Sequence, residues 1–214
     1  MSRAEQAIPI QLFEDITRHL LEEGKPSRYI EELVKQGLFR YYPLSMLQQL
    51  KNAQQSPQHH PEGNVWNHTM LVLDQAAGMK DRSKKPDVLL WAALLHDIGK
   101  PSTTRRRGGR IISYDHDREG EKLCRDFLQY FRREASFVEE VAAMVRYHMH
   151  LLYVLRKLPF ADMKGLLERT DIEELALLCL CDRLGRGNAA VSKEEEEYRE
   201  FLRQLRQYAA MKSE

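Results

Sequence analysis

Five histidines and two aspartates in this chain have side chains that can bind a metal ion or move a proton. Both aspartates directly follow apolar segments that we expect to be buried: Asp97 comes after Leu94, Leu95 and His96, and Asp182 comes after Leu180 and Cys181. A buried carboxylate without a partner is costly unless it is paired with a cation or binds a metal. The residue types and their setting therefore suggest a metal site. The candidate residues are His60, His68, His96, Asp97, His116, His148 and Asp182.

Imidazole nitrogens combined with carboxylate oxygens suit a divalent transition metal such as Mn, Fe, Co, Ni or Zn. Asp97 has two oxygens and can bridge two ions, so the pattern leaves one or two ions open, with a spacing of roughly 3.5–4 Å in the second case. A single histidine at a helix end is more often structural than a ligand. We give only that structural interpretation to His19, His59 and His150. Lys100 is either a phosphate-binding residue or a solvated cation at a helix end.

Composition excludes several classes of protein. The chain has 214 residues, with 33 Lys and Arg against 32 Asp and Glu, so its net charge of +1 provides no global attraction to nucleic acid or to a membrane. The longest apolar run, residues 88–95, is far shorter than the ~20 residues that span a bilayer, and the N-terminus does not resemble a secretory signal. We therefore expect no membrane association and a cytoplasmic location. The three cysteines, Cys124, Cys179 and Cys181, are expected to be buried free thiols.

Apolar residues recur at intervals of three and four almost throughout, which predicts an all-α fold and a single domain over 1–214. The Arg-rich segment 103–114, with its Gly108-Gly109 pair, is the exception and favours a small β-hairpin whose arginines are either solvated or guide a phosphate. Asp117, Ser136, Thr170 and Ser192 are expected N-caps, and the acidic run 194–197 a solvated first turn. The expected helices cover 8–20, 27–37, 43–50, 65–79, 86–98, 117–131, 136–148, 175–182 and a final amphipathic helix after 192.

Two strings in the sequence carry a family resemblance. Residues 60–69 read HPEGNVWNHT and residues 93–101 read ALLHDIGKP, which contains an intact HDIG motif. These strings resemble the HD superfamily of metal-dependent phosphohydrolases, and within it the HD domain of bacterial CCA-adding tRNA nucleotidyltransferases. His116-Asp117, the segment 146–149 and the segment 182–187 continue the likeness in the same order. The resemblance covers about residues 26–187 and implies an HD-type helical bundle flanked by an N-terminal helix and a C-terminal amphipathic helix.

The resemblance also implies roles for individual residues. His68, His96, Asp97 and Asp182 would be the primary metal ligands, with His116 and His148 on or beside a second ion. Asp97, Lys100, His116 and His148 would be the catalytic residues, and Lys100 would face the phosphate. Arg118, Arg146 and Arg186 are weaker candidates for phosphate contacts. Tyr147 stands where many two-metal relatives have a further histidine, Asp115 precedes His116 where a glycine is common, and no nucleotidyltransferase domain is expected before the motif.

These observations predict a metal-dependent phosphohydrolase, a phosphatase or phosphodiesterase. Its substrate would be a phosphomonoester or phosphodiester of a nucleotide, or a terminal or cyclic phosphate at an RNA end. In that mechanism a metal-activated water attacks phosphorus while the metal and Lys100 stabilise the developing charge. The alternative is a non-catalytic, metal-containing HD module that binds a nucleotide, RNA or a partner protein. The final amphipathic helix caps the core or meets a partner chain, which makes a homodimer possible.

Overall fold

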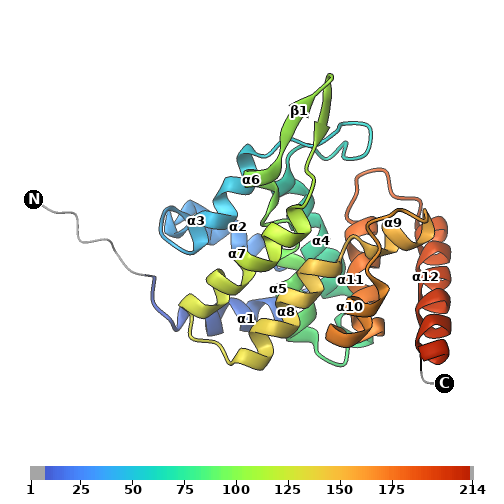
Figure 1. Ribbon diagram of the computed structural model, residues 1–214. Helices are drawn as coiled ribbons and strands as arrows, with labels where there is room; N and C mark the ends of the chain where they lie inside the picture. Colours follow the sequence, from blue (N-terminus) through green and yellow to red (C-terminus); the bar gives the residue numbers. More distant parts are fainter. Residues whose placement is uncertain (1–7, 213–214) are drawn as a thin grey trace, which may run out of the picture.

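A computed structural model of the chain describes residues 8–212, and helices dominate it (Figure 1). The predicted all-α fold with a small β-hairpin is confirmed. Short 3-10 turns η1 (Leu38–Arg40), η2 (Gln49–Asn52) and η3 (Lys80–Arg82) join some of the helices. The α-helices are α1 (Leu12–Glu22), α2 (Ser27–Lys35), α3 (Leu44–Gln48), α4 (Val65–Met79), α5 (Pro86–Leu95), α6 (Lys100–Thr103), α7 (His116–Tyr130), α8 (Ala135–Tyr147), α9 (His150–Leu155), α10 (Met163–Arg169), α11 (Ile172–Leu184) and α12 (Val191–Lys212).

The hairpin consists of strands β1 (Arg105–Arg107) and β2 (Arg110–Ile112), which pair antiparallel with Arg105 opposite Ile112. Gly108 and Gly109 form its turn, and both have positive φ angles, of 55° and 74°. Glycine adopts such angles without steric cost, which explains the pair at this position. The hairpin projects from the helical body at the top of Figure 1.

Helix α5 lies at the centre of the main core and contacts α1, α4, α8 and α11. Its residues from Val88 to Leu95 are all buried, so the apolar run that cannot span a membrane is a helix surrounded by other helices. Trp91 of α5 stacks on Phe13 of α1 with ring centroids 4.3 Å apart, and its Nε1 donates a hydrogen bond to the Oγ1 of Thr17. The core thus fixes the end of α5, where His96 and Asp97 follow.

A second cluster of buried side chains lies between α8–α11 and the C-terminal helix α12. It includes Leu166, Leu175, Phe201 and Leu205, and α12 stands at one side of the bundle (Figure 1). Helix α11 contributes residues to both clusters. The single domain over 1–214 stays a prediction, and residues 1–7 and 213–214 of that range lie outside the described part.

The acidic start of α12 differs from the expected solvated turn. Arg183 of α11 is buried and donates hydrogen bonds to Glu194 at 2.6 Å and to Glu197 at 2.7 Å. Glu194 is itself buried. The prediction that residues 194–197 form a solvated run is therefore wrong for these two glutamates, because they neutralise a guanidinium that the fold has removed from water.

Several predicted helix caps are also wrong. Helix α7 begins one residue earlier than expected, after Asp115 with a φ of 58°, and Asp117 lies inside the helix, where it accepts a hydrogen bond from Arg146. The cap of α11 is Asp171, whose Oδ1 accepts from the Glu173 amide at 2.8 Å. Thr170 instead donates to the carbonyl oxygen of Leu166.

Helices α8 and α12 also begin earlier than expected. Ser136 and Ser192 lie inside them, because the helices start at Ala135 and Val191. Short polar side chains compete for neighbouring cap positions, so the sequence alone does not decide between them.

All three cysteines are buried and free, as predicted. Within residues 8–212, no helix combines the length and the apolar character that crossing a bilayer requires.

We predict that Phe201→Ala destabilises the protein by about 3–5 kcal/mol, because it leaves a cavity where a fully buried ring joined α12 to α11. Urea denaturation monitored by circular dichroism measures the change. Val191→Ala, at an exposed position on the same helix, is the control and should change stability by less than about 0.5 kcal/mol. Equal stability of the two variants would show that α12 is not part of the cooperative unit.

Candidate metal centre

The structure brings six of the predicted residues together from five segments of the chain. They form two clusters of three, and within each cluster one ligand atom per residue lies within 4.8 Å of the others. All six side chains are buried. The first cluster is His68 of α4, His96 after α5 and Asp182 of α11; the second is Asp97 after α5, His116 of α7 and His148 after α8.

The convergence depends on a glycine. Gly99 follows His96 and Asp97 in a tight turn, and the first turn of α7 packs directly on it. A Cβ at this position would clash with the carbonyl oxygen of His116 and lie 2.6 Å from the amide nitrogen of Gly120. Only a glycine lets the two backbones approach this closely, and that approach brings His116 to Asp97.

Three of the histidines are held in one tautomer. The Nδ1 atoms of His96, His116 and His148 each lie at hydrogen-bond distance from a backbone carbonyl oxygen, which can only accept, so each Nδ1 carries the proton. In the neutral ring the Nε2 lone pair is then free, and all three Nε2 atoms face the centre. This arrangement is typical of metal-binding histidines. The acceptors are Ala93 at 2.8 Å, Ser113 at 2.6 Å and Val145 at 2.6 Å.

The second cluster has an excess of lone pairs. The Nε2 atoms of His116 and His148 are 3.3 Å apart. Burial lowers the pKa of both rings, and burial together with the neighbouring His116 lowers that of His148 to about 4. Oδ1 of Asp97 lies 3.6 Å and 3.7 Å from these two nitrogens and has no hydrogen-bond donor. Two neutral rings and a carboxylate that point their lone pairs at one spot call for a cation between them.

Asp97 faces both clusters. Its Oδ2 lies 3.2 Å from Nε2 of His96 and 2.7 Å from Nζ of Lys100, on the side away from His116. Burial alone would raise its pKa, but interactions with His96 and Lys100 hold that pKa well below its usual value. The ionised carboxylate would therefore be available as a ligand to an ion in either cluster.

The first cluster is supported by a glutamate that sequence reasoning missed. Nε2 of His68 lies 2.9 Å from Oδ1 of Asp182, and its Nδ1 lies 3.0 Å from Oε1 of Glu62. Glu62 also contacts His60 at 2.8 Å and accepts from the Gly187 amide at 3.0 Å. Burial opposes its ionisation, but these contacts lower its pKa to about 2. In the sequence, only the HPEG string drew attention to Glu62, and that string did not indicate a contact between Glu62 and His68.

Tyr147 takes no part in either cluster. Its ring belongs to the second hydrophobic cluster, and its hydroxyl donates to Asp162. The departure from a histidine at this position therefore leaves the second cluster with three donor residues among those described, namely Asp97, His116 and His148.

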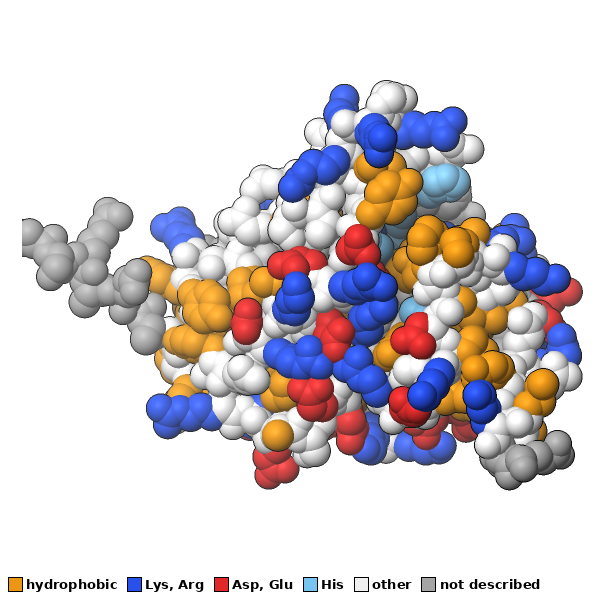
Figure 2. Space-filling view, in the orientation of Figure 1, with side chains coloured by type: hydrophobic (Ala, Val, Ile, Leu, Met, Phe, Trp, Pro, Cys, Tyr) orange, Lys and Arg blue, Asp and Glu red, His pale blue; other side chains and the backbone are white. Residues whose placement is uncertain are grey.

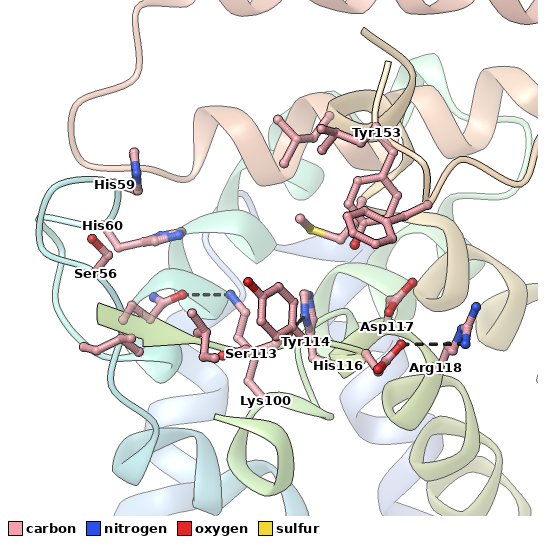
Figure 3. A pocket seen from close by; sticks show the side chains of 18 of the residues that line it. Ser56, His59, His60, Lys100, Ser113, Tyr114, His116, Asp117, Arg118 and Tyr153 are labelled. Atoms are coloured by element: carbon pink, nitrogen blue, oxygen red, sulfur yellow. Dashed lines mark hydrogen bonds and ion pairs between the residues drawn. The ribbon is translucent and has the colours of Figure 1, made fainter. Parts of the chain in front are cut away.

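A cavity of about 730 Å³ opens beside His116 of the second cluster (Figure 3). Lys100, His60 and His116 line it next to the centre. The Lys100 ammonium, whose side chain is only 13% exposed, binds Asp97 and donates to Oε1 of Gln55 at 2.8 Å. The alternative of a solvated helix-end cation is therefore wrong for Lys100. Phosphate-sized anions entering the cavity would meet this ammonium.

The three weaker arginine candidates lie in different settings. Arg118 is exposed on the cavity wall, and Arg146 also lines the cavity but is bound to the buried Asp117. The guanidinium of Arg186 lies 3.9 Å from Asp182, beside the first cluster. Arg118 is thus the one of the three that is both exposed and on the cavity wall.

The three histidines interpreted as structural differ in their burial and contacts. His19 stacks on Tyr29 and contacts Glu23. His150 is buried, and its Nε2 accepts a hydrogen bond from the Asp162 amide. His59, in contrast, lines the large cavity (Figure 3) and is not part of a core. The structural interpretation holds for His19 and His150 and not for His59.

The sequence that forms this fold and these two clusters matches the model of a protein family, the HD domain family. The model of that family, described as HD domain, matches residues 65–187, more than half of the chain, so the chain belongs to this family. The match spans α4 to the end of α11 and includes all six clustered residues.

Curated relatives extend the similarity to nearly the whole chain. A multifunctional CCA protein of Verminephrobacter eiseniae is 32% identical over 189 residues, which is 85% of this chain and 44% of the relative. Proteins of the same name from Polaromonas naphthalenivorans and Halorhodospira halophila are each 31% identical, over 84% and 86% of this chain and 42% and 44% of their own length. The chain therefore spans less than half of the relatives it matches.

We predict a pH dependence of stability that involves His150. Burial, followed by the charge of Arg146, lowers its pKa from 6.5 to about 4. Below pH 6.5 the unfolded chain binds a proton that the folded state excludes, so stability falls as the pH drops from 6.5 towards 4. The contribution of this one residue between pH 7 and pH 5 is about 2 kcal/mol.

Urea denaturation of His150→Gln at both pH values tests this prediction. The glutamine oxygen can still accept from Asp162 but does not titrate, so the variant should lose less stability on acidification than the parent protein. His59→Gln, at an exposed position, is the control. An acid-induced loss in His150→Gln as large as in the parent would contradict the prediction.

Proposed function

We propose that this protein is a metal-dependent phosphohydrolase that cleaves a phosphate ester of a nucleotide or of an RNA end. The observation that carries the proposal is the second cluster, where two imidazoles with free Nε2 lone pairs and an ionised carboxylate converge on one point. This point lies beside a cavity large enough for a nucleotide and next to the Lys100 ammonium.

In this proposal His68, His96, Asp97 and Asp182 hold one divalent ion, and Asp97, His116 and His148 hold or border a second one. The mixed nitrogen and oxygen donors favour Mn, Fe, Co, Ni or Zn. The buried atoms without hydrogen-bond partners, Nε2 of His96 and Oδ1 of Asp97, fit this role, since a metal would satisfy both.

A bound divalent ion supplies Lewis-acid polarisation of a phosphoryl oxygen and activation of water. The chain's own contribution is to bind and orient the ester. Lys100 is held by Asp97 and Gln55 at the cavity wall, where its ammonium can donate to a phosphoryl oxygen and stabilise charge that develops there. Arg118, exposed on the same wall, can bind a second anionic group.

His116 and His148 are better suited to bind metal than to act as general acids. Each ring keeps a proton on Nδ1 and donates it in a hydrogen bond to a backbone carbonyl oxygen, and burial lowers the pKa of both rings, so the Nε2 that faces the centre carries no proton to transfer. Among the predicted catalytic residues we therefore assign these two to metal binding, and Asp97 and Lys100 to the reacting phosphate and its ions.

The choice of substrate rests on two supports. The cavity of about 730 Å³ exceeds the space that inorganic phosphate needs, which favours a larger ester. The relatives are named multifunctional CCA proteins, and the HD domain that this chain resembles belongs to tRNA-processing enzymes, which favours a nucleotide or a terminal or cyclic phosphate on RNA.

We predict that Asp97→Ala abolishes metal retention and lowers phosphodiester hydrolysis by at least about 10²-fold, because it removes the carboxylate shared by both clusters. Elemental analysis after dialysis without chelator, and hydrolysis of an aryl phosphodiester with each candidate metal, measure the two effects. The control is Asp126→Ala, an exposed aspartate on α7.

Undiminished metal content and activity in Asp97→Ala would refute the assignment. Metal bound by the parent protein without turnover of any phosphate ester would instead favour the non-catalytic binding module. In that case ligand-dependent thermal stabilisation should remain.

We also predict that Glu62→Ala weakens metal binding by about 10–100-fold without abolishing it, because His68 loses the carboxylate that fixes its tautomer. Metal titration of the chelator-treated protein measures the affinity. Glu168→Ala, on the surface of α10, is the control. Unchanged affinity in Glu62→Ala would show that Asp182 alone orients His68.

A further inference from the structure

Two segments beside the large cavity have a charge very different from that of the whole chain. Residues 49–60 and 100–114 contain six Lys and Arg and no Asp or Glu, whereas the chain as a whole is nearly neutral. The first segment runs from η2 to the metal centre, and the second includes α6 and the hairpin. Lys and Arg side chains are visible over the hairpin at the top of Figure 2, beside exposed histidine.

The hairpin arginines are not neutralised within the described residues. Arg105 donates to the carbonyl oxygen of Thr104, and Arg106 donates to Oε1 of Gln54 at 2.9 Å. Among residues 8–212 no carboxylate pairs with either of them, nor with Arg107 or Arg110 at the turn. An uncompensated set of guanidinium groups is a site for anions, and phosphate oxygens suit their geometry.

A smaller cavity of about 260 Å³ lies under the hairpin and adjoins the large one. Gln54 and Ile111 line both cavities, so the two are neighbours along one wall. The smaller cavity is lined by Arg105 and Arg106 and by amide side chains from residues 49–54. This lining offers several hydrogen-bond donors and no carboxylate.

Further hydrogen-bond donors lie between this cavity and the candidate metal centre. Gln55 is 92% buried on the wall of the large cavity, its Oε1 accepts from Lys100, and its Nε2 has no partner. A buried donor without a partner costs free energy, so a ligand oxygen at this position would remove that cost. Hydrogen-bond donors thus line a path from the smaller cavity to the candidate metal centre. They belong to Arg105, Arg106, Gln55 and Lys100.

Aromatic rings also line the large cavity. Tyr114 and Phe160 line the cavity and are 67% and 57% exposed, and Phe160 contacts Tyr153 with ring centroids 5.6 Å apart (Figure 3). Exposed aromatic side chains beside a basic groove are typical of proteins that bind single-stranded nucleic acid, because unstacked bases can stack on them.

We propose that the hairpin and the smaller cavity hold the sugar-phosphate backbone of a single-stranded RNA whose phosphorylated end lies in the large cavity. This proposal rests on the proposed function and deepens it, since it makes an RNA strand rather than a free nucleotide the preferred substrate. Arg105 and Arg106 bind backbone phosphates, Gln55 and Lys100 bind the terminal phosphate, and Tyr114 stacks on a base.

The test compares a mononucleotide 2′,3′-cyclic phosphate with a short single-stranded RNA that ends in the same group. The double variant Arg105→Gln/Arg106→Gln should raise KM for the RNA about tenfold and leave kcat/KM for the mononucleotide within about twofold. Arg199→Gln/Arg203→Gln on α12 is the matched control and should change neither value. Equal losses on both substrates, or no loss on the RNA, would overturn the proposal.

Binding without turnover provides an independent measurement. Fluorescence anisotropy of labelled RNA with chelator-treated protein should give a Kd that rises in the hairpin variant. The logarithmic slope of affinity against salt should become shallower by about 0.7 for each phosphate that the variant no longer binds. Tyr114→Ala should also weaken RNA binding, and Tyr114→Phe should restore it. If the parent protein hydrolyses neither substrate, the proposed function fails, but these binding results still decide the present proposal.

The same assay tests whether other polyanions compete with the RNA. Anionic phospholipid vesicles or polyglutamate that displace the RNA at equal charge concentration would overturn the assignment to RNA, because charge alone would then explain binding. Preferential binding of single-stranded RNA by the parent protein, together with weaker binding by Tyr114→Ala, supports the assignment.

Discussion

The structure depends on the burial of one carboxylate, that of Asp97, among groups that cannot neutralise it by hydrogen bonding alone. Three imidazole nitrogens with free lone pairs surround it, and Lys100 is its one cationic neighbour among the described residues. Lys100 helps to keep the carboxylate ionised, but no positive charge among residues 8–212 lies between Oδ1 of Asp97 and the nitrogen lone pairs of His116 and His148, and a cation there would interact favourably with all three. The arrangement of these side chains therefore fits a bound cation. The surrounding helices hold the side chains in place.

The framework is rigid because its parts are fixed by the backbone. Three of the histidines are anchored through carbonyl oxygens, and Gly99 permits the backbone contact that sets the position of His116. Helix α5, buried from Val88 to Leu95, positions His96 and Asp97 at its end, at the centre of the core. The exposed and charged part of the site, in contrast, lies outside, on the hairpin and the cavity wall. This division separates a buried candidate metal centre from an exposed, charged surface.

Much of the fold and the centre could be predicted from the sequence, because apolar spacing defines helices and because histidine and aspartate at the ends of apolar helices are unusual. The HDIG string and its companions located all six clustered residues. The caps at Asp117 and Thr170 were mispredicted, since several short polar residues compete at each helix start. Glu62 and the Arg183 pairs were missed for a different reason: each contact joins positions whose proximity only the tertiary fold creates.

Helix α12 looks like an appendage on the side of the bundle, yet it is tied to the centre by adjacent residues of α11. Asp182 turns inwards to His68, while the next residue, Arg183, turns outwards to the glutamates of α12. Two adjacent residues of α11 thus contact the first cluster and α12, respectively. A displacement of α12 would therefore act on the residue next to Asp182, in addition to the contacts that α12 makes with α11 in the second hydrophobic cluster.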